Sequence, residues 1–186
     1  MNYYKCWEKC SLIIEDGQID KAEAYILGEA KKMGVSDEVT NKIFAVNLKR
    51  YENRLKKDFD EVLKHVTDDI QAICLYYSVD DSWSGTYYLC NTYNDNDIEW
   101  FGNSRNWFDT GRMRKFGEIF ERDAESAFFC DPVGSGILSL LMYRTTIAFV
   151  NVISQYKDLR LNIGISCDEN SFVKIHNVVH NKQQTD

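Results

Sequence analysis

Apolar positions recur at helical spacing through the first 66 residues. They lie three to four residues apart from Tyr3 to Glu15. A second stripe begins at Asp20, which has a capping glutamate three residues later, and it closes at Gly34. From Ser36 to Val66 the spacing stays at three to five residues without any glycine or proline. These patterns predict a helical hairpin followed by one long helix.

The pattern changes to an alternation of period two after residue 70, and β-branched and aromatic residues become frequent. Ala72–Val79 and Gly85–Tyr93 are predicted as an antiparallel pair of strands joined by the loop at residues 80–84. A shorter third strand is predicted at Ile98–Gly102, because residues 94–97 read Asn-Asp-Asn-Asp and favour a turn. The middle of the chain is therefore expected to form a meander of three strands.

Two further helices and a final hairpin are predicted in the C-terminal part. Helical periodicity covers Gly111 to about Ala127 and, with a broader apolar surface, Ile137 to about Tyr156. Clean alternation then predicts a strand at Leu159–Cys167 and a second at Phe172–Val179. The turn between these two strands is expected at residues 168–171.

These elements predict an α+β fold. We expect a mainly antiparallel sheet of about five strands packed on the two later helices, preceded by the N-terminal hairpin and the long helix. The single proline, Pro132, marks no linker, so residues 1–186 are expected to form one domain. Within it, residues 1–67 form a helical part and residues 70–186 an α+β part.

Composition and apolar runs indicate a cytoplasmic protein. No basic segment followed by an apolar one opens the chain, as a secretory signal requires. The most apolar run, residues 137–156, contains Arg144, Asn151 and Gln155, which are costly in lipid and ordinary on a core helix. The six cysteines are widely spread, which favours reduced and mostly buried thiols.

Three short motifs have some features of cofactor or metal sites. Gly134-Ser135-Gly136 lacks the third glycine of a dinucleotide fingerprint and the Gly-Lys-Ser/Thr of a P-loop, so helix entry explains it better. Cys6 and Cys10 have no second ligand pair nearby, and Asp95-Asn96-Asp97 departs from the order of an EF-hand loop. We therefore expect no cofactor and no metal.

Histidines offer the only other candidate chemistry. His176 and His180 lie four residues apart, but on a predicted strand that spacing is about 13 Å, too far to share a metal ion. An enzyme that uses His65, His176 or His180 with a carboxylate stays open as the weakest of three hypotheses. No catalytic signature surrounds any serine or cysteine, and the expectation is that the protein is not an enzyme.

Negative charge and tryptophan are concentrated in one window, residues 80–109. This window contains six acidic residues and one basic residue, whereas the whole chain has a net charge of −7. Three of the four tryptophans also lie there. Aromatic residues are enriched in binding hot spots, and clustered acids attract basic proteins, whereas direct nucleic-acid binding is disfavoured. The predicted partner-binding residues are Asp80, Asp81, Trp83, Asp95, Asp97, Glu99 and Trp100.

The small size, the acidity and the abundance of Asn, Tyr, Lys and Ile resemble those of bacterial immunity proteins that neutralise polymorphic or contact-dependent growth-inhibition toxins. The resemblance implies an inhibitor that occludes the basic active site of a nuclease-type toxin. It rests on no motif, so no residue role is carried over from that class of proteins.

An intracellular adaptor that uses the N-terminal helices is the second hypothesis. Residues 16–26 resemble the turn and second helix of a tetratricopeptide-type repeat. Only one copy is present, and such repeats need neighbours to bury their faces, so a plain helical hairpin is the preferred interpretation.

Overall fold

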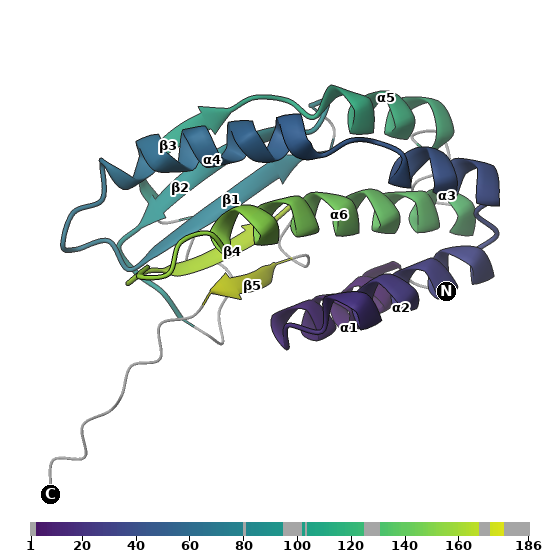
Figure 1. Cartoon of the computed structure of the whole chain (residues 1–186), viewed down its shortest axis with the longest axis horizontal. Coiled ribbons are helices and arrows are strands. Elements are labelled where there is room, and N and C mark those ends of the chain that lie inside the picture. The colour runs from purple at the N-terminus through teal and green to yellow at the C-terminus, as the bar shows by residue number, and fades with distance from the viewer. Residues whose placement is uncertain are drawn as a thin grey trace, which may run out of the picture.

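The computed structural model describes residues 3–79, 81–94, 102, 104–124, 131–167 and 172–176. Its helices gather on one side of a five-stranded sheet, with α4 and α6 lying along the strands (Figure 1). The helices are α1 (Tyr3–Glu15), α2 (Ile19–Lys32), α3 (Asp37–Phe44), α4 (Lys49–Leu63), α5 (Arg114–Asp123) and α6 (Pro132–Ile153). The strands are β1 (Ala72–Ser78), β2 (Ser84–Cys90), β3 (Ser104–Thr110), β4 (Asn162–Ser166) and β5 (Val173–His176).

The sheet has the strand order β3-β2-β1-β4-β5. Neighbouring strands are antiparallel except for β1 and β4, which run parallel with Ile73 beside Ile163. The parallel pair is possible because α5 and α6 lie between β3 and β4 in the chain and carry it back across the sheet. The predicted α+β fold with a mainly antiparallel sheet of five strands is confirmed.

Helix α6 is the central element of the core. It is apolar on all sides, and 15 of its 22 residues are buried. The Asp131 side chain accepts a hydrogen bond from Val133 N–H at 3.2 Å, and Pro132 occupies the first turn, so the helix starts earlier than Ile137. Among the described residues it alone is long and apolar enough to cross a membrane, but 78% of its most apolar window is buried inside this fold.

The glycines at the start of α6 serve helix packing. A Cβ atom on Gly136 would lie 2.6 Å from Val35 Cγ2 and 3.2 Å from Met33 Cβ. Only glycine therefore lets α6 approach the end of α2 this closely. This contact supports helix entry and packing as the role of Gly134-Ser135-Gly136.

The prediction of one long helix from Ser36 to Val66 is wrong. The structure has two helices, α3 and α4, separated by residues 45–48. Arg144 of α6 donates through Nη2 to Phe44 O at 3.3 Å and to Val46 O at 2.9 Å, which satisfies carbonyls that a continuous helix would use internally. Asn47 Oδ1 then accepts from Lys49 N–H at 2.9 Å at the start of α4.

The third strand lies later in the chain than predicted. The structure forms it at Ser104–Thr110, a segment for which the sequence pattern predicts no strand. Of the predicted Ile98–Gly102, residues 98–101 lie outside the described residues, and Gly102 is not in a strand. β3 is an edge strand whose residues 105–107 are consecutively exposed, and it therefore lacks the alternation that identifies a half-buried strand.

The C-terminal strands are confirmed in outline and are shorter than predicted. β4 covers Asn162–Ser166 and β5 covers Val173–His176, while residues 168–171 and 177–186 lie outside the described part. The polar face of β4 is buried together with its apolar face, and the Phe172 ring lies over Gly164 on that face. Alternation thus identified the strand but misassigned one of its faces to solvent.

Candidate functional site

The two faces of the sheet have different surroundings. One face supplies residues such as Leu75 and Tyr87 to the large core, where they pack with the helices. The other face carries a small separate cluster of Ala72, Cys74 and Cys90. The partly buried side chains around this cluster come from strands and nearby connections, and none comes from a described helix. Because no helix among the described residues packs on this face, we call it the uncovered face.

A row of aromatic side chains crosses the uncovered face from β1 to β3. Tyr88 of β2 lies opposite Trp107 of β3, and Tyr76 of β1 packs edge-on against Tyr88 with ring centroids 6.4 Å apart. Tyr76 and Tyr88 are half-buried, but 64% of Trp107 is exposed. Exposed tryptophan is uncommon because its burial is worth several kcal/mol, so this row is the candidate functional site.

An aspartate lies beside the aromatic row. Asp109 follows Trp107 by two residues on the same face of β3 and lies opposite Thr86, whose hydroxyl donates to Asp109 Oδ1 at 3.0 Å. Burial raises the pKa of Tyr88, and the charge of Asp109 raises it further. Among the described residues, no cation lies within ion-pair distance of Asp109. Its carboxylate is therefore available to a cation from outside the described chain.

A second aspartate, Asp81, lies at the hairpin tip beyond this face. Ser84, which belongs to the uncovered face, donates its hydroxyl to Asp81 Oδ2 at 2.8 Å. Arg112 Nη2 lies 2.9 Å from the other carboxylate oxygen. Both partners of this ion pair are about half exposed, so the pair orients Asp81 but adds little stability.

The turn that presents Asp81 holds two residues in a left-handed conformation. Ser82 has φ = 50° and Trp83 has φ = 59°, and Ser84 N–H donates to Asp81 O at 2.9 Å, the pattern of a type I′ turn. Such a conformation costs non-glycine residues about 1–3 kcal/mol each. Contacts outside the turn must therefore hold it.

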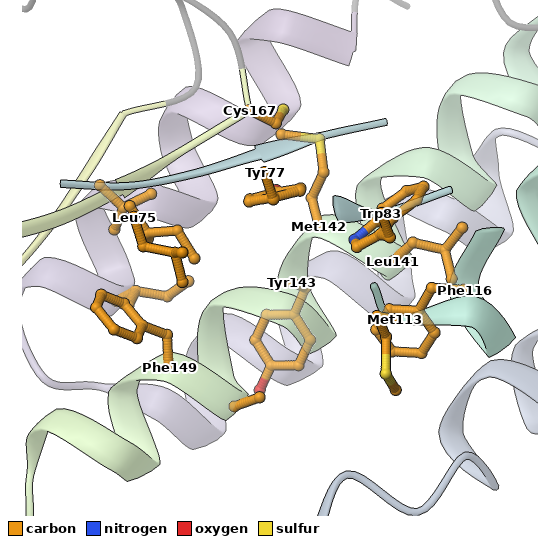
Figure 2. Close-up of a cluster of buried hydrophobic side chains, with 14 of the residues drawn as sticks. Leu75, Tyr77, Trp83, Met113, Phe116, Leu141, Met142, Tyr143, Phe149 and Cys167 are labelled. Atoms are coloured by element: carbon orange, nitrogen blue, oxygen red, sulfur yellow. The ribbon is translucent and has the colours of Figure 1, made fainter. Parts of the chain in front are cut away.

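Trp83 provides these contacts from inside the core, and Figure 2 shows it beside Phe116, Leu141 and Met142. Its indole N–H donates to Thr145 Oγ1 at 2.8 Å, and its ring stacks on Tyr77 with centroids 5.9 Å apart. Trp83 is fully buried. It anchors the loop from below, and the prediction of Trp83 as a partner-binding residue gives way to this structural role.

Two of the seven predicted partner-binding residues lie in the part of the chain that the structure describes. Asp81 is exposed at the hairpin tip, and Trp83 is buried beneath it. The other five lie outside the described residues: Asp80, Asp95, Asp97, Glu99 and Trp100. The structure adds Tyr76, Tyr88, Trp107 and Asp109, which share one face of neighbouring strands. Alternation of Trp107 and Asp109 could have shown that they share a face, had β3 been recognised as a strand.

The candidate catalytic groups do not meet in the described structure. His65 packs on Phe108 near the β3 edge of the sheet, with ring centroids 4.7 Å apart, and His176 lies at the opposite edge with Nε2 3.1 Å from Leu159 O. His180 lies outside the described residues. Within the described part, no three His, Cys, Asp or Glu side chains could hold a metal ion together.

The described cysteines are all buried and unbridged. Burial raises the pKa of Cys6 to about 11 and that of Cys10 to about 12, and it raises the pKa of Cys74 well above its ordinary value. Thiolate is therefore scarce at neutral pH, and these side chains act as small apolar groups.

Comparison of the chain with protein-family models, with curated proteins and with solved structures gives no match.

Proposed function

We propose that this protein is a cytoplasmic, non-enzymatic inhibitor that binds a basic protein, and that its partner is a nuclease-type toxin which it neutralises as an immunity protein. The observation that supports this proposal is the uncovered face, where exposed Trp107 lies in a row with Tyr88 and Tyr76 and beside Asp109. Tryptophan and tyrosine are the side chains most enriched in binding hot spots, because they bury a large area at low entropic cost.

The charge of the surrounding segment supports a basic partner. Asp109 and Asp81 both belong to the acidic window of residues 80–109, which has six acids and one basic residue. An acidic surface accelerates encounter with a basic protein and repels nucleic acid, the substrate that an occluding inhibitor would have to exclude. Trp107 would supply most of the binding affinity, and the acidic residues would raise the association rate and the selectivity for a basic partner.

The proposal predicts that an adjacent reading frame encodes a toxin-like nuclease domain, and it is tested by mixing that purified domain with this protein. A stable complex that blocks nuclease activity is expected. Trp107→Ala should weaken binding by about 30-fold or more, as loss of a central hot-spot residue does. Leu12→Ala is the matched control, because Leu12 is also a large exposed side chain, at 57%, but lies on α1. Absence of a complex and of inhibition would refute the proposal.

Charge provides a second arm of the same experiment. Asp109→Asn should slow association and reduce its dependence on salt, with little change in dissociation. Asp16→Asn removes an equal charge from an exposed position at the end of α1 and should leave the association rate nearly unchanged. Equal effects of the two variants would mean that only net charge matters and that the uncovered face is not the binding surface.

An adaptor that uses the N-terminal helices is the second candidate, and exposed Leu12 on α1 is the observation that favours it. Deletion of the hairpin would not test it, because α2 buries Ala22, Ile26 and Ala30 in the core. Point substitution does: if Leu12→Ala abolishes binding to a partner and Trp107→Ala does not, the helical surface is the functional one.

A further inference from the structure

The two edge strands of the sheet, β5 and β3, differ in what contacts their outer sides. At the β5 edge, Glu15 of α1 accepts a hydrogen bond from Lys174 N–H at 2.8 Å, so a helix side chain meets an outward-facing donor of the strand. At the other edge, β3 makes its main contacts with β2 and α4. Among the described residues, no strand pairs with the outer side of β3. An unpaired row of backbone donors and acceptors is a template for another strand.

The sequence of β3 is self-complementary when it is read in opposite directions. Trp107 is its middle residue, with Arg105 two positions before it and Asp109 two positions after it. We propose that β3 pairs antiparallel with β3 of a second copy of this chain, with the two-fold axis at Trp107. Arg105 then lies opposite Asp109 of the second copy, and this attraction occurs twice.

Symmetry limits the registers that need to be compared. A two-fold axis normal to the sheet must place like faces together. One residue of β3 therefore lies directly opposite its own copy, with the axis midway between the two. Centring it on Asn106 sets Arg105 opposite Trp107, and centring it on Phe108 sets Trp107 opposite Asp109. Only the register centred on Trp107 pairs both charges, and it also places two exposed indole rings side by side on the uncovered face.

Two features of β3 bear on how readily the pair forms. Arg105 already pairs with Asp69 at 3.1 Å, but that pair is more than half exposed on the arginine side, so exchanging it for a new one is nearly neutral. The pairing of β2 with β3 is irregular opposite Leu89 and Cys90, which leaves Arg105 as an extra residue of β3. The regular pairing with β2 covers Asn106–Thr110, so Arg105 must straighten into register when the pair forms, and this costs part of the energy that the two ion pairs supply. The predicted dimer is therefore weak and reversible.

The dimer goes beyond the proposed function and is independent of it. Both use Trp107 and Asp109, so a basic partner would compete with the second copy for the same residues. Self-association would then cover the exposed tryptophan until such a partner displaces it.

The test is sedimentation equilibrium of the isolated full-length protein, with no partner present. The wild type should associate with a Kd below about 1 mM. Arg105→Asp and Asp109→Arg should each weaken association by about tenfold or more, because two attractions become repulsions. The double variant that carries both changes restores opposite charges and should return to within about threefold of the wild type. Single variants that associate as the wild type does, or a double variant that fails to recover, would overturn the proposal, as would a monomeric wild type.

A cross-linking measurement tests the register separately. Trp107→Cys places thiols opposite one another across the axis, at a Cβ separation of about 4.5–5.5 Å, and mild oxidation should yield a covalent dimer. The described native cysteines are buried and should not contribute. Leu12→Cys, at the other exposed apolar position, is the control and should stay monomeric. Equal cross-linking of both variants would show random collision and refute the paired edge.

Discussion

The two faces of this sheet differ in the side chains and helices that pack against them. On the helix-covered face, Leu75, Tyr77, Tyr87 and Leu89 are at most 1% exposed and pack against α4, α5 and α6. On the uncovered face, the half-buried tyrosines pack on a small apolar cluster, which among the described residues consists of Ala72, Cys74 and Cys90. Among the described residues, most apolar packing therefore lies on the helix-covered side, and exposed Trp107 takes no part in it. An aromatic residue that costs little to remove is one that binding, and not folding, has reason to keep.

Substitution of the two tryptophans in turn gives the largest expected contrast. Trp83→Ala should lower the free energy of unfolding by about 3–5 kcal/mol, because it leaves a cavity beneath the hairpin and removes the bond to Thr145. Trp107→Ala should change it by no more than about 0.5 kcal/mol. Urea unfolding followed by circular dichroism measures both. Equal losses would mean that Trp107 is part of the folded framework and would weaken its assignment to binding.

Glycine substitution measures how tightly the covered side is packed. Gly136→Ala should destabilise the protein by about 1–3 kcal/mol, because the new methyl group would overlap Val35 at the contact between α6 and α2. Gly28→Ala is the matched control: a Cβ atom at that position in α2 meets nothing within 4 Å, so helix propensity should stabilise the protein by about 0.5–1 kcal/mol. Thermal unfolding of the two variants should thus move in opposite directions.

The same contrast explains which features the sequence could predict. Periodicity identified the hairpin of α1 and α2 and the first strand pair, since each has one face against the large core, and a long apolar run identified the core helix. The break between α3 and α4 escaped it because the group that ends α3 is Arg144, about a hundred residues later in the chain. β3 escaped it because an edge strand on the uncovered side has little to bury.

The candidate site was only partly predictable for a related reason. The acidic and aromatic window contains Trp107 and Asp109, but local sequence could not show which aromatic side chains face solvent. Trp83 lies beside acidic residues and is nevertheless buried, because Thr145 offers its indole a hydrogen-bond partner from a distant helix. Tyr76 belongs to a strand before the window and joins the site only through pairing of β1 with β2.

Removal of a side chain that packs on the small cluster of Ala72, Cys74 and Cys90 should have a local effect without loss of the global fold. Burial raises the pKa of Cys90 to about 12, and among the described residues Tyr88 packs against the cluster that contains it. Tyr88→Ala should expose this thiol, lower its pKa toward the ordinary value and speed its reaction with a disulfide reagent at pH 8 by about tenfold or more. Cys10, buried beneath α1 and α2, should react as slowly as in the wild type. If both thiols become reactive together, the variant has unfolded globally and the two faces are not independently stabilised.

The smallest expected effect concerns the outer surface of the covered side, where α4 meets the chain just after α6. The Tyr156 hydroxyl donates to Asp60, and this bond, assisted by Lys56, holds the pKa of Asp60 below its ordinary value of 3.8. A carboxyl whose pKa is lowered by folding stabilises the protein above its unfolded pKa, and that stabilisation is lost as the pH falls through the lower, folded value. Tyr156→Phe should therefore cost only about 0.5 kcal/mol or less at pH 7, because Asp60 is well exposed and screened by water. It should also flatten the decline of stability between pH 4 and lower pH, relative to the wild type. An unchanged pH profile would mean that the contact between Tyr156 and Asp60 adds no measurable stability. The stability of the covered side would then come from its apolar packing.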